Sequence, residues 1–211
     1  MVDFGLYLIT DRMQTAGRRL PAVIADSLRG GLRAVQLREK DLSAGQLFEL
    51  AVELRQLTRE YGAQLLINDR IDVVLASDAD GVHLGKAGVP VLEARRILGR
   101  DRLIGYSAHS VDEALQAQQD GADFVTLGPV YSTPSKAQYG EPLGVGVLAE
   151  ASRLVAIPVF ALGGVKPGMI PEILAAGAHG VALISAVMTA ANPADVTELL
   201  LRSLVHHATA C

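Results

Sequence analysis

The chain of 211 residues is long enough for one α/β barrel, and half of its residues are hydrophobic, with only 4% aromatic. Its 21 glycines and its lack of tryptophan favour repeated small aliphatic strands over an aromatic-cored sandwich. A formal net charge of −4 gives no general attraction to nucleic acid or to an anionic membrane, so any phosphate site must be local.

The single cysteine, Cys211, excludes a disulfide within the chain, and the sequence contains no run of about 18 apolar residues. The first residues lead into a short apolar run without the basic start of a signal peptide. The sequence therefore predicts a soluble cytoplasmic protein with no nucleic-acid or membrane partner. No change of composition marks a linker, so we expect one domain over residues 1–211. A homo-oligomer stays open.

Short apolar runs alternate with helical patterns along the chain. The expected strands are 6–9, 34–37, 65–67, 81–84, 103–106, 124–127, 158–162 and 180–184. Helical patterns follow them, at 21–28, 43 to about 61, about 71–77, 90–98, 111–119, 144–154 and 193–204 among others. Eight such units predict a parallel sheet that closes into a (β/α)8 TIM barrel, with an open doubly wound sheet as the alternative.

Functional groups of a parallel barrel lie at the C-terminal ends of its strands. After the second strand, Gln36, Arg38 and Lys40 alternate, so the period of two turns all three the same way while Glu39 points elsewhere. Two cations and an amide suit an anionic substrate. A strand end that continues into a solvated, charged loop is the plainer alternative.

The stretch 123–136 has the sequence D-F-V-T-L-G-P-V-Y-S-T-P-S-K, in which a buried strand breaks at Gly128 into a segment rich in hydroxyls. Thr133, Ser135 and Lys136 offer two hydroxyls and an ammonium within four residues, which also suits an anion. An ordinary turn is the alternative, because serine, threonine and proline are common in turns.

Two further strand ends indicate a phosphate site. Gly163 and Gly164 follow the seventh strand, and Ile184 and Ser185 follow the eighth, where barrels often bind phosphate through backbone N–H groups. Glycines at such a position would let the backbone approach the ligand closely. The glycine pair is equally compatible with a tight turn that has no ligand.

The third and fifth strands end in metal-binding and titratable groups. Asn68 and Asp69 offer oxygen ligands suited to Mg²⁺ beside substrate phosphates, although Asp69 could instead cap the next helix. Ser107 and His109 follow the fifth strand, and His109 is a candidate proton carrier or a residue that only orders its loop. His83 lies inside an apolar strand, where we expect a hydrogen-bonded core histidine.

Six motifs in order resemble the thiamine-phosphate synthase family over nearly the whole chain. They are Q-L-R-E-K at 36–40, N-D-R at 68–70, D-G-V-H-L-G at 80–85, G-A-D-F at 121–124, T-P-S-K at 133–136 and G-G at 163–164. The resemblance implies a (β/α)8 barrel that uses Mg²⁺. It would join 4-amino-2-methyl-5-pyrimidinylmethyl diphosphate to hydroxyethylthiazole phosphate and release diphosphate.

The resemblance also implies a role for each matching residue. The phosphates and the pyrimidine would be held by Gln36, Arg38, Lys40, Ser107, Thr133, Ser135 and Lys136. Asn68 would serve the diphosphate, Asp69 the metal, and Gly164, Ile184 and Ser185 the thiazole phosphate. The expected catalytic groups are Lys40, Arg38, Ser107, Lys136 and His109.

One position departs from the family pattern. After H-L-G the family usually has Gln-x-Asp, whose Asp is a second Mg²⁺ ligand, whereas this chain has Lys86, Ala87 and Gly88. A related branch, the thiazole tautomerases, aromatises thiazole phosphate by proton transfer with a histidine that His109 matches. The residues for the diphosphate favour the synthase, with the tautomerase as the alternative.

Two interpretations with other functions also stay open. A non-catalytic regulatory protein that binds a thiamine precursor would show the same missing metal ligand. An isomerase of a sugar or indole phosphate could use the same barrel, and only Asp69 and His109 offer themselves as its acid and base.

Overall fold

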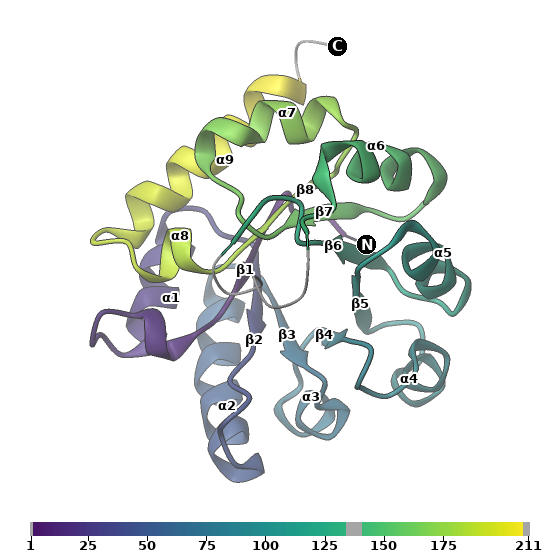
Figure 1. The fold of residues 1–211 in the computed structure, drawn as a ribbon. Coiled ribbons are helices and arrows are strands. Elements are labelled where there is room, and N and C mark those ends of the chain that lie inside the picture. Colours follow the sequence, from purple (N-terminus) through teal and green to yellow (C-terminus); the bar gives the residue numbers. More distant parts are fainter. Residues whose placement is uncertain (1, 134–140, 209–211) are drawn as a thin grey trace.

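Eight parallel strands close into a barrel in chain order in the computed structural model, which describes residues 2–133 and 141–208 (Figure 1). The strands are β1 (Leu6–Ile9), β2 (Ala34–Leu37), β3 (Gln64–Asn68), β4 (Gly81–Leu84), β5 (Leu103–Ala108), β6 (Phe124–Leu127), β7 (Val159–Leu162) and β8 (Gly180–Leu183). Closure comes from β1, which pairs with both β2 and β8. The prediction of a (β/α)8 barrel is confirmed.

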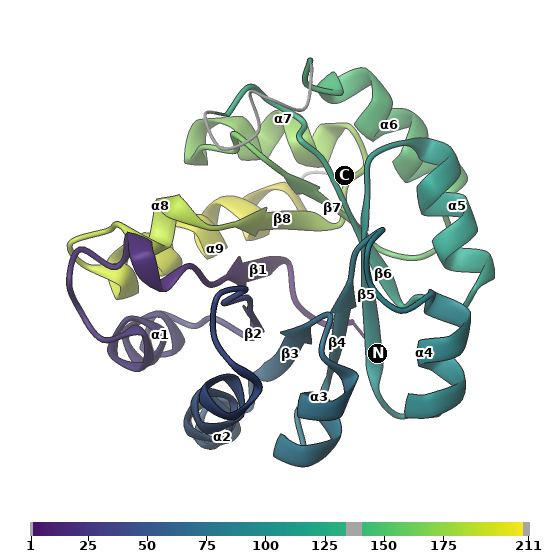
Figure 2. The ribbon, with the colours of Figure 1, turned by 60° about the horizontal axis from the view of Figure 1, so that its bottom comes forward.

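Helices surround the strands on the outside of the barrel (Figure 2). They are α1 (Leu20–Arg29), α2 (Ala44–Glu60), α3 (Ile71–Ser77), α4 (Val91–Leu98), α5 (Val111–Gln119), α6 (Gly144–Leu154), α7 (Ile170–Ala175), α8 (Ser185–Met188) and α9 (Pro193–Ala208), with 3₁₀ turns η1 (Arg12–Gln14) and η3 (Pro167–Met169). Ser43 caps α2 in a reciprocal capping box with Gln46. Within the described residues, no helix has the length and apolar character needed to span a membrane.

Aromatic rings fill the barrel interior near the N-terminal ends of the strands. Phe4 stacks on Phe160 with ring centroids 5.3 Å apart, and the edge of Phe124 meets Phe4 at 5.6 Å. Tyr7 packs on Phe124 at 5.3 Å. All four side chains are buried. This aromatic plug leaves the C-terminal ends of the strands as the open mouth of the barrel.

A glycine on β5 makes room for the rings of the interior. A Cβ atom on Gly105 would lie 2.4 Å from Phe124 Cζ and 2.5 Å from His83 Nδ1, distances that no real side chain tolerates. Residue 105 faces the interior because side chains alternate along a strand, and Ser107, two residues later, faces the same way nearer the mouth.

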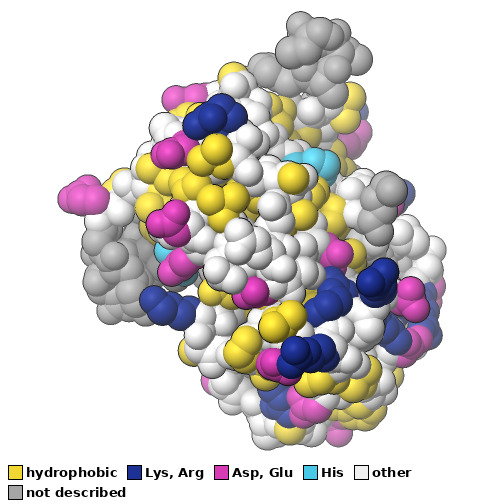
Figure 3. Space-filling model, turned by 90° about the vertical axis from the view of Figure 1, so that its right-hand side faces the viewer, with side chains coloured by type: hydrophobic (Ala, Val, Ile, Leu, Met, Phe, Trp, Pro, Cys, Tyr) yellow, Lys and Arg dark blue, Asp and Glu magenta, His cyan; other side chains and the backbone are white. Residues whose placement is uncertain are grey.

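The outer surface mixes charges. On the face in Figure 3, which is the right-hand side of Figure 1, lysine and arginine side chains lie among aspartate and glutamate side chains. Hydrophobic side chains lie between them. This face carries no extended field of one sign, so a phosphate site has to be sought at a local cluster.

Candidate active site

In the loop after β2, the acidic side chains and the basic side chains have different surroundings. Glu39 is buried and accepts hydrogen bonds from Thr10 Oγ1 at 2.6 Å and from the Arg12 amide at 3.1 Å. Arg12 also holds Asp41 through two contacts of 2.6 Å, and this hydrogen bonding lowers the pKa of Asp41. Both acidic side chains are therefore tied to the loop after β1, in line with the alternation that turned Glu39 away from its neighbours.

The two cations of the same loop keep their charges available. Within residues 2–133 and 141–208, the side chains of Arg38 and Lys40 form no ion pair, while Arg12 takes both nearby carboxylates. The Arg38 amide donates to Thr10 Oγ1 at 2.9 Å, which fixes the backbone from which the guanidinium extends. Two cations that have no acidic partner in these ranges, on a loop whose backbone is held by Thr10, are chemically suited to an anion.

Polar side chains from β2, β3 and β5 lie near these cations. Gln36, on β2, is buried and donates from Nε2 to Tyr7 Oη at 3.1 Å. Ser107, on β5, has its Oγ 3.0 Å from His83 Nε2. Asn68 ends β3 and donates from Nδ2 to Asp69 Oδ2 at 2.8 Å. The structure thus brings Gln36 and Ser107 into one hydrogen-bonded group and holds Asn68 at a neighbouring strand end.

Tyr7 and His83 complete this group, and sequence reasoning gave Tyr7 no role. Tyr7 Oη lies 3.3 Å from His83 Nδ1. His83 is buried and hydrogen-bonded as expected, and burial, with a smaller effect from the charge of Arg38, lowers its pKa to about 3. Strand alternation turns both residues toward the interior, but only the closed barrel shows that they meet there.

The turn after β7 packs against the loop after β6. Gly163 and Gly164 have φ angles of +94° and +68°, and the Tyr131 amide donates to Gly163 O at 3.1 Å. A Cβ atom on Gly164 would lie 2.6 Å from Ser132 O and 2.8 Å from Tyr131 Cβ. Close approach to the chain's own β6 loop therefore requires this glycine, whereas the sequence suggested close approach to a ligand.

The remaining predicted phosphate residues border the same region. Ile184 directly precedes α8, which begins at Ser185, and the first N–H groups of a helix have no partner within the helix. Thr133 is the last described residue before the gap in the loop after β6, and Ser135 and Lys136 lie outside the described residues. The ends of β6, β7 and β8 are neighbours in the barrel, so Thr133, Gly164 and Ser185 belong to one side of the mouth.

Comparison with known proteins decides the family. The family model TMP-TENI, thiamine monophosphate synthase, matches residues 6–187, which span the barrel from β1 to α8. The chain belongs to this family. Its fold matches the solved structure of a thiamine phosphate pyrophosphorylase from Pyrococcus furiosus, with a TM-score of 0.87, 38% identity and 95% of both chains covered.

Curated relatives of this thiamine monophosphate synthase family match over nearly their whole length. A protein from Geobacter sulfurreducens, named "Putative thiamine-phosphate synthase", is 58% identical over 203 residues, which cover 96% of this chain and 95% of the relative. A thiamine-phosphate synthase from Chloroflexus aurantiacus is 44% identical over 205 residues, which cover 97% and 94%.

The position that departs from the family pattern lies beside Asp69. A Cβ atom on Gly88 would lie 2.7 Å from Asp69 Oδ1, so a carboxylate at position 88 would adjoin that of Asp69. Asp69 has a φ of +57°, and its Oδ1 accepts the Gly85 amide at 3.2 Å. It does not cap α3, whose cap residue is Arg70 with no side-chain hydrogen bond.

These residues fit a metal ion that is held mainly by its substrate. In the described ranges, no three histidine, cysteine, aspartate or glutamate side chains come together as a metal site. Asp69 offers a single carboxylate, and Gly88 packs directly against it without adding a second one. Mg²⁺ commonly binds through one or two carboxylates plus substrate phosphates, so this donor set suits Mg²⁺ that arrives with a diphosphate.

His109 lies on the other side of the mouth and has a ring nitrogen that can act as a base. Its Nδ1 lies 2.6 Å from Gly128 O, and because a carbonyl only accepts, Nδ1 carries the proton and Nε2 can accept one. Glu113 fixes the backbone here by accepting the His109 amide at 2.8 Å. The other carboxylate oxygen of Glu113 lies 3.8 Å from Lys86 Nζ. The Lys86 side chain, which is 83% exposed, is therefore turned toward Glu113.

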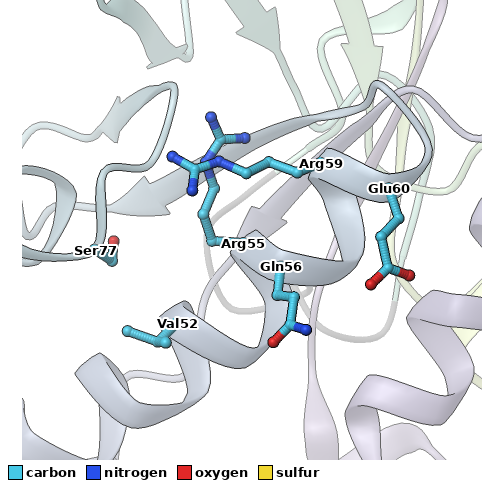
Figure 4. A pocket seen from close by; sticks show the side chains of 6 residues that line it. All are labelled: Val52, Arg55, Gln56, Arg59, Glu60 and Ser77. Atoms are coloured by element: carbon cyan, nitrogen blue, oxygen red, sulfur yellow. The ribbon is translucent and has the colours of Figure 1, made fainter.

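A hollow on the outside of the barrel, between α2 and α3, is a poor alternative site (Figure 4). It has a volume of about 410 Å³ and is lined by Val52, Arg55, Gln56, Arg59, Glu60 and Ser77. Arg55 pairs with Asp80 at 2.7 Å, and Arg59 pairs with Asp78. The two arginines of this hollow are already neutralised, in contrast to Arg38 and Lys40.

Proposed function

We propose that this protein is a thiamine-phosphate synthase. It joins 4-amino-2-methyl-5-pyrimidinylmethyl diphosphate to hydroxyethylthiazole phosphate and releases diphosphate. The observation that carries the proposal is the separation of charge after β2, where Arg12 engages Glu39 and Asp41 while Arg38 and Lys40 stay available for an anion. A tautomerase, whose substrate has no diphosphate, would have no use for this pair.

The reaction breaks the bond between the methylene carbon of the pyrimidine and the diphosphate oxygen, and its electron pair leaves with the diphosphate. Arg38 and Lys40 would act where this negative charge develops, which lowers the barrier more than ground-state binding would. Ser107 would contact the departing group from the interior, Gln36 would orient the pyrimidine half, and Asn68 would serve the diphosphate. The thiazole nitrogen then bonds to the methylene carbon.

The other substrate would bind at the strand ends β6 to β8. Backbone N–H groups at Gly164, Ile184 and Ser185 would hold the thiazole phosphate, as helix N-termini commonly do. Thr133 would add a hydroxyl. Ser135 and Lys136 are assigned to the same phosphates by the family motif and lie outside the described residues.

Asp69 is the residue that would hold Mg²⁺, with the rest of its ligands coming from the diphosphate and water. The ion, when bound, would neutralise part of the charge of the diphosphate. Asn68 would orient the Asp69 carboxylate through the contact of 2.8 Å described above. A cytoplasmic location and assembly into a homo-oligomer stay predictions.

The purified protein with both substrates and Mg²⁺ tests the proposal directly. Thiamine phosphate and diphosphate should appear in equal amounts, and Arg38→Ala should abolish both. Failure to form either product over a wide range of Mg²⁺ concentrations would reject the synthase. Tight binding of both substrates without product would instead favour a regulatory protein that binds thiamine precursors.

A thiazole tautomerase is the second candidate, and a separate observation favours it. His109 donates through Nδ1 and so leaves Nε2 free to accept a proton, while Gly88 supplies no second carboxylate. The matching assay supplies the non-aromatic thiazole phosphate alone. Aromatisation by the wild type that His109→Asn stops, without any synthase activity, would establish the tautomerase.

A further inference from the structure

A chain of hydrogen bonds crosses the barrel interior directly below the mouth. Gln36 Nε2 donates to Tyr7 Oη at 3.1 Å, Tyr7 Oη lies 3.3 Å from His83 Nδ1, and His83 Nε2 lies 3.0 Å from Ser107 Oγ. Thr126 Oγ1 is farther from His83 Nε2, at 3.5 Å. The chain starts at Gln36 and ends at Ser107, two residues to which the proposed function gives substrate contacts, and the two middle residues, Tyr7 and His83, are buried.

The order of donors and acceptors in this chain follows from counting protons. His83 is 2% exposed and has no carboxylate among its hydrogen-bond partners in the described ranges, so its imidazole is neutral, with one donor and one acceptor nitrogen. Tyr7 has one hydroxyl proton and already accepts from Gln36, so it donates that proton to His83 Nδ1. The proton of His83 therefore sits on Nε2 and is donated to Ser107 Oγ.

We infer that His83, with Tyr7, is a positioning residue that keeps Ser107 as a hydrogen-bond donor to substrate. Because Ser107 Oγ accepts from His83, its own O–H is left to point into the mouth, where it can donate to an acceptor atom such as a phosphate or diphosphate oxygen. In the described part of the chain, Ser107 Oγ has no other side-chain partner to take that proton.

If every donor and acceptor in this series of hydrogen bonds were exchanged, Ser107 would accept a hydrogen bond from a ligand instead of donating one. If the Gln36 amide presented its oxygen to Tyr7, then Tyr7 would donate to it, His83 would be protonated on Nδ1, and Ser107 would donate to His83. The Ser107 oxygen would then only accept from a ligand. The Gln36 amide and the Ser107 hydroxyl are thus coupled across three hydrogen bonds, and the tautomer of His83 reports which order is present.

Packing holds the imidazole in the orientation that this chain needs. The His83 ring lies 5.6 Å from the Tyr7 ring and 5.7 Å from the Phe124 ring, measured between centroids. Gly105 leaves the space that His83 Nδ1 occupies, because a Cβ atom there would lie 2.5 Å away. Rotation of the ring is therefore blocked by its neighbours, and the tautomer is set by hydrogen bonding.

Nitrogen-15 NMR of the histidine side chains in the ligand-free protein tests the inference without relying on activity. The His83 signals, assigned by their loss in His83→Gln, should show a proton on Nε2 at neutral pH. Tyr7→Phe removes the donor to Nδ1 and should give a mixture of tautomers. A wild-type His83 protonated on Nδ1 overturns the inference, whatever the enzyme's activity.

Kinetics give a second readout, which rests on the proposed synthase function. The Gln side chain can place an N–H near the position of His83 Nε2, so His83→Gln should lower kcat by less than about threefold, whereas the shorter His83→Asn should lower it about tenfold. Equal losses in both variants, with unchanged far-ultraviolet circular dichroism, would overturn the positioning role. A wild type that is inactive on both substrates rejects the synthase instead, and the NMR result then decides this inference alone.

Discussion

Replacing Gly164 by alanine should move the loop that follows β6. The new Cβ atom would lie 2.6 Å from Ser132 O and 2.8 Å from Tyr131 Cβ, and neither the carbonyl nor the Cβ is the far end of a flexible side chain. The φ of +68° adds strain for any residue other than glycine. The hydrogen bond from the Tyr131 amide to Gly163 O, which joins the two loops, would have to lengthen or break.

The structure allows the size of this effect to be worked out. A left-handed conformation costs alanine about 1–2 kcal/mol, and forcing an extra methyl group into a packed site costs about 1–3 kcal/mol. We therefore expect Gly164→Ala to lower the free energy of unfolding by roughly 2–5 kcal/mol. The substitution should also weaken thiazole phosphate binding, because Thr133 and the Gly164 amide both shift.

Gly62→Ala is the matched control. Gly62 has a φ of +61°, and a Cβ atom added there would have no atom within 4 Å, so its substitution carries the backbone strain alone. Urea unfolding would compare the two variants, and calorimetry with chelator present would measure thiazole phosphate binding. Equal destabilisation by both substitutions, with binding intact in Gly164→Ala, would refute the close packing of the two loops.

Four further expectations concern the metal, the cations and the buried histidine. Gly88→Asp should lower the Mg²⁺ concentration that gives half-maximal activity, because the new carboxylate would adjoin that of Asp69. An unchanged or higher Mg²⁺ requirement would show that position 88 is not a ligand position in this chain. Lys86→Gln should depress turnover most when Mg²⁺ is scarce if this ammonium assists the metal, whereas equal loss at all concentrations would restrict Lys86 to its pairing with Glu113. Lys40→Ala should lower kcat at least about tenfold with little change in KM, and an effect on KM alone would mark Lys40 as a simple binding residue. Because the pKa of His83 is about 3 when folded and ordinarily about 6.5, only the unfolded state gains this proton between those values, so stability falls as the pH drops from about 6.5 toward 3. From pH 6.5 to 5 the wild type should lose about 2 kcal/mol more than His83→Gln in urea unfolding, and parallel losses would contradict a neutral buried His83.

Local patterns were sufficient for the barrel and for the buried position of Glu39. The period of two along β2 set Glu39 apart from the cations beside it, and Glu39 is in fact buried and held by Thr10. The position of the glycine pair after β7 did not reveal that Gly164 packs against Ser132, a residue 32 positions earlier in the chain that only the closed sheet brings close. Sequence spacing contains no information on such a contact.

Tyr7 was missed for a related reason. Within an apolar run a tyrosine is indistinguishable from any core aromatic residue, and its hydroxyl acquires a meaning only once His83 and Gln36 are placed around it. His83 was correctly expected to be buried and hydrogen-bonded, but its partners lie on β1, β5 and β6, which no local pattern identifies. Polar residues inside a barrel are therefore best considered together, strand by strand.

The aromatic plug of Phe4, Phe124 and Phe160 bears on the kinetics of a reaction with two substrates. Because the plug closes the N-terminal end of the barrel, both substrates have to enter through the same mouth. The substrate that binds deeper must then bind first, and the second substrate covers it. Steady-state analysis would show a compulsory order of addition in place of a random one. Of the two products, thiamine phosphate and diphosphate, the one that lies deeper would leave last. As a product inhibitor, it would compete with the substrate that binds first.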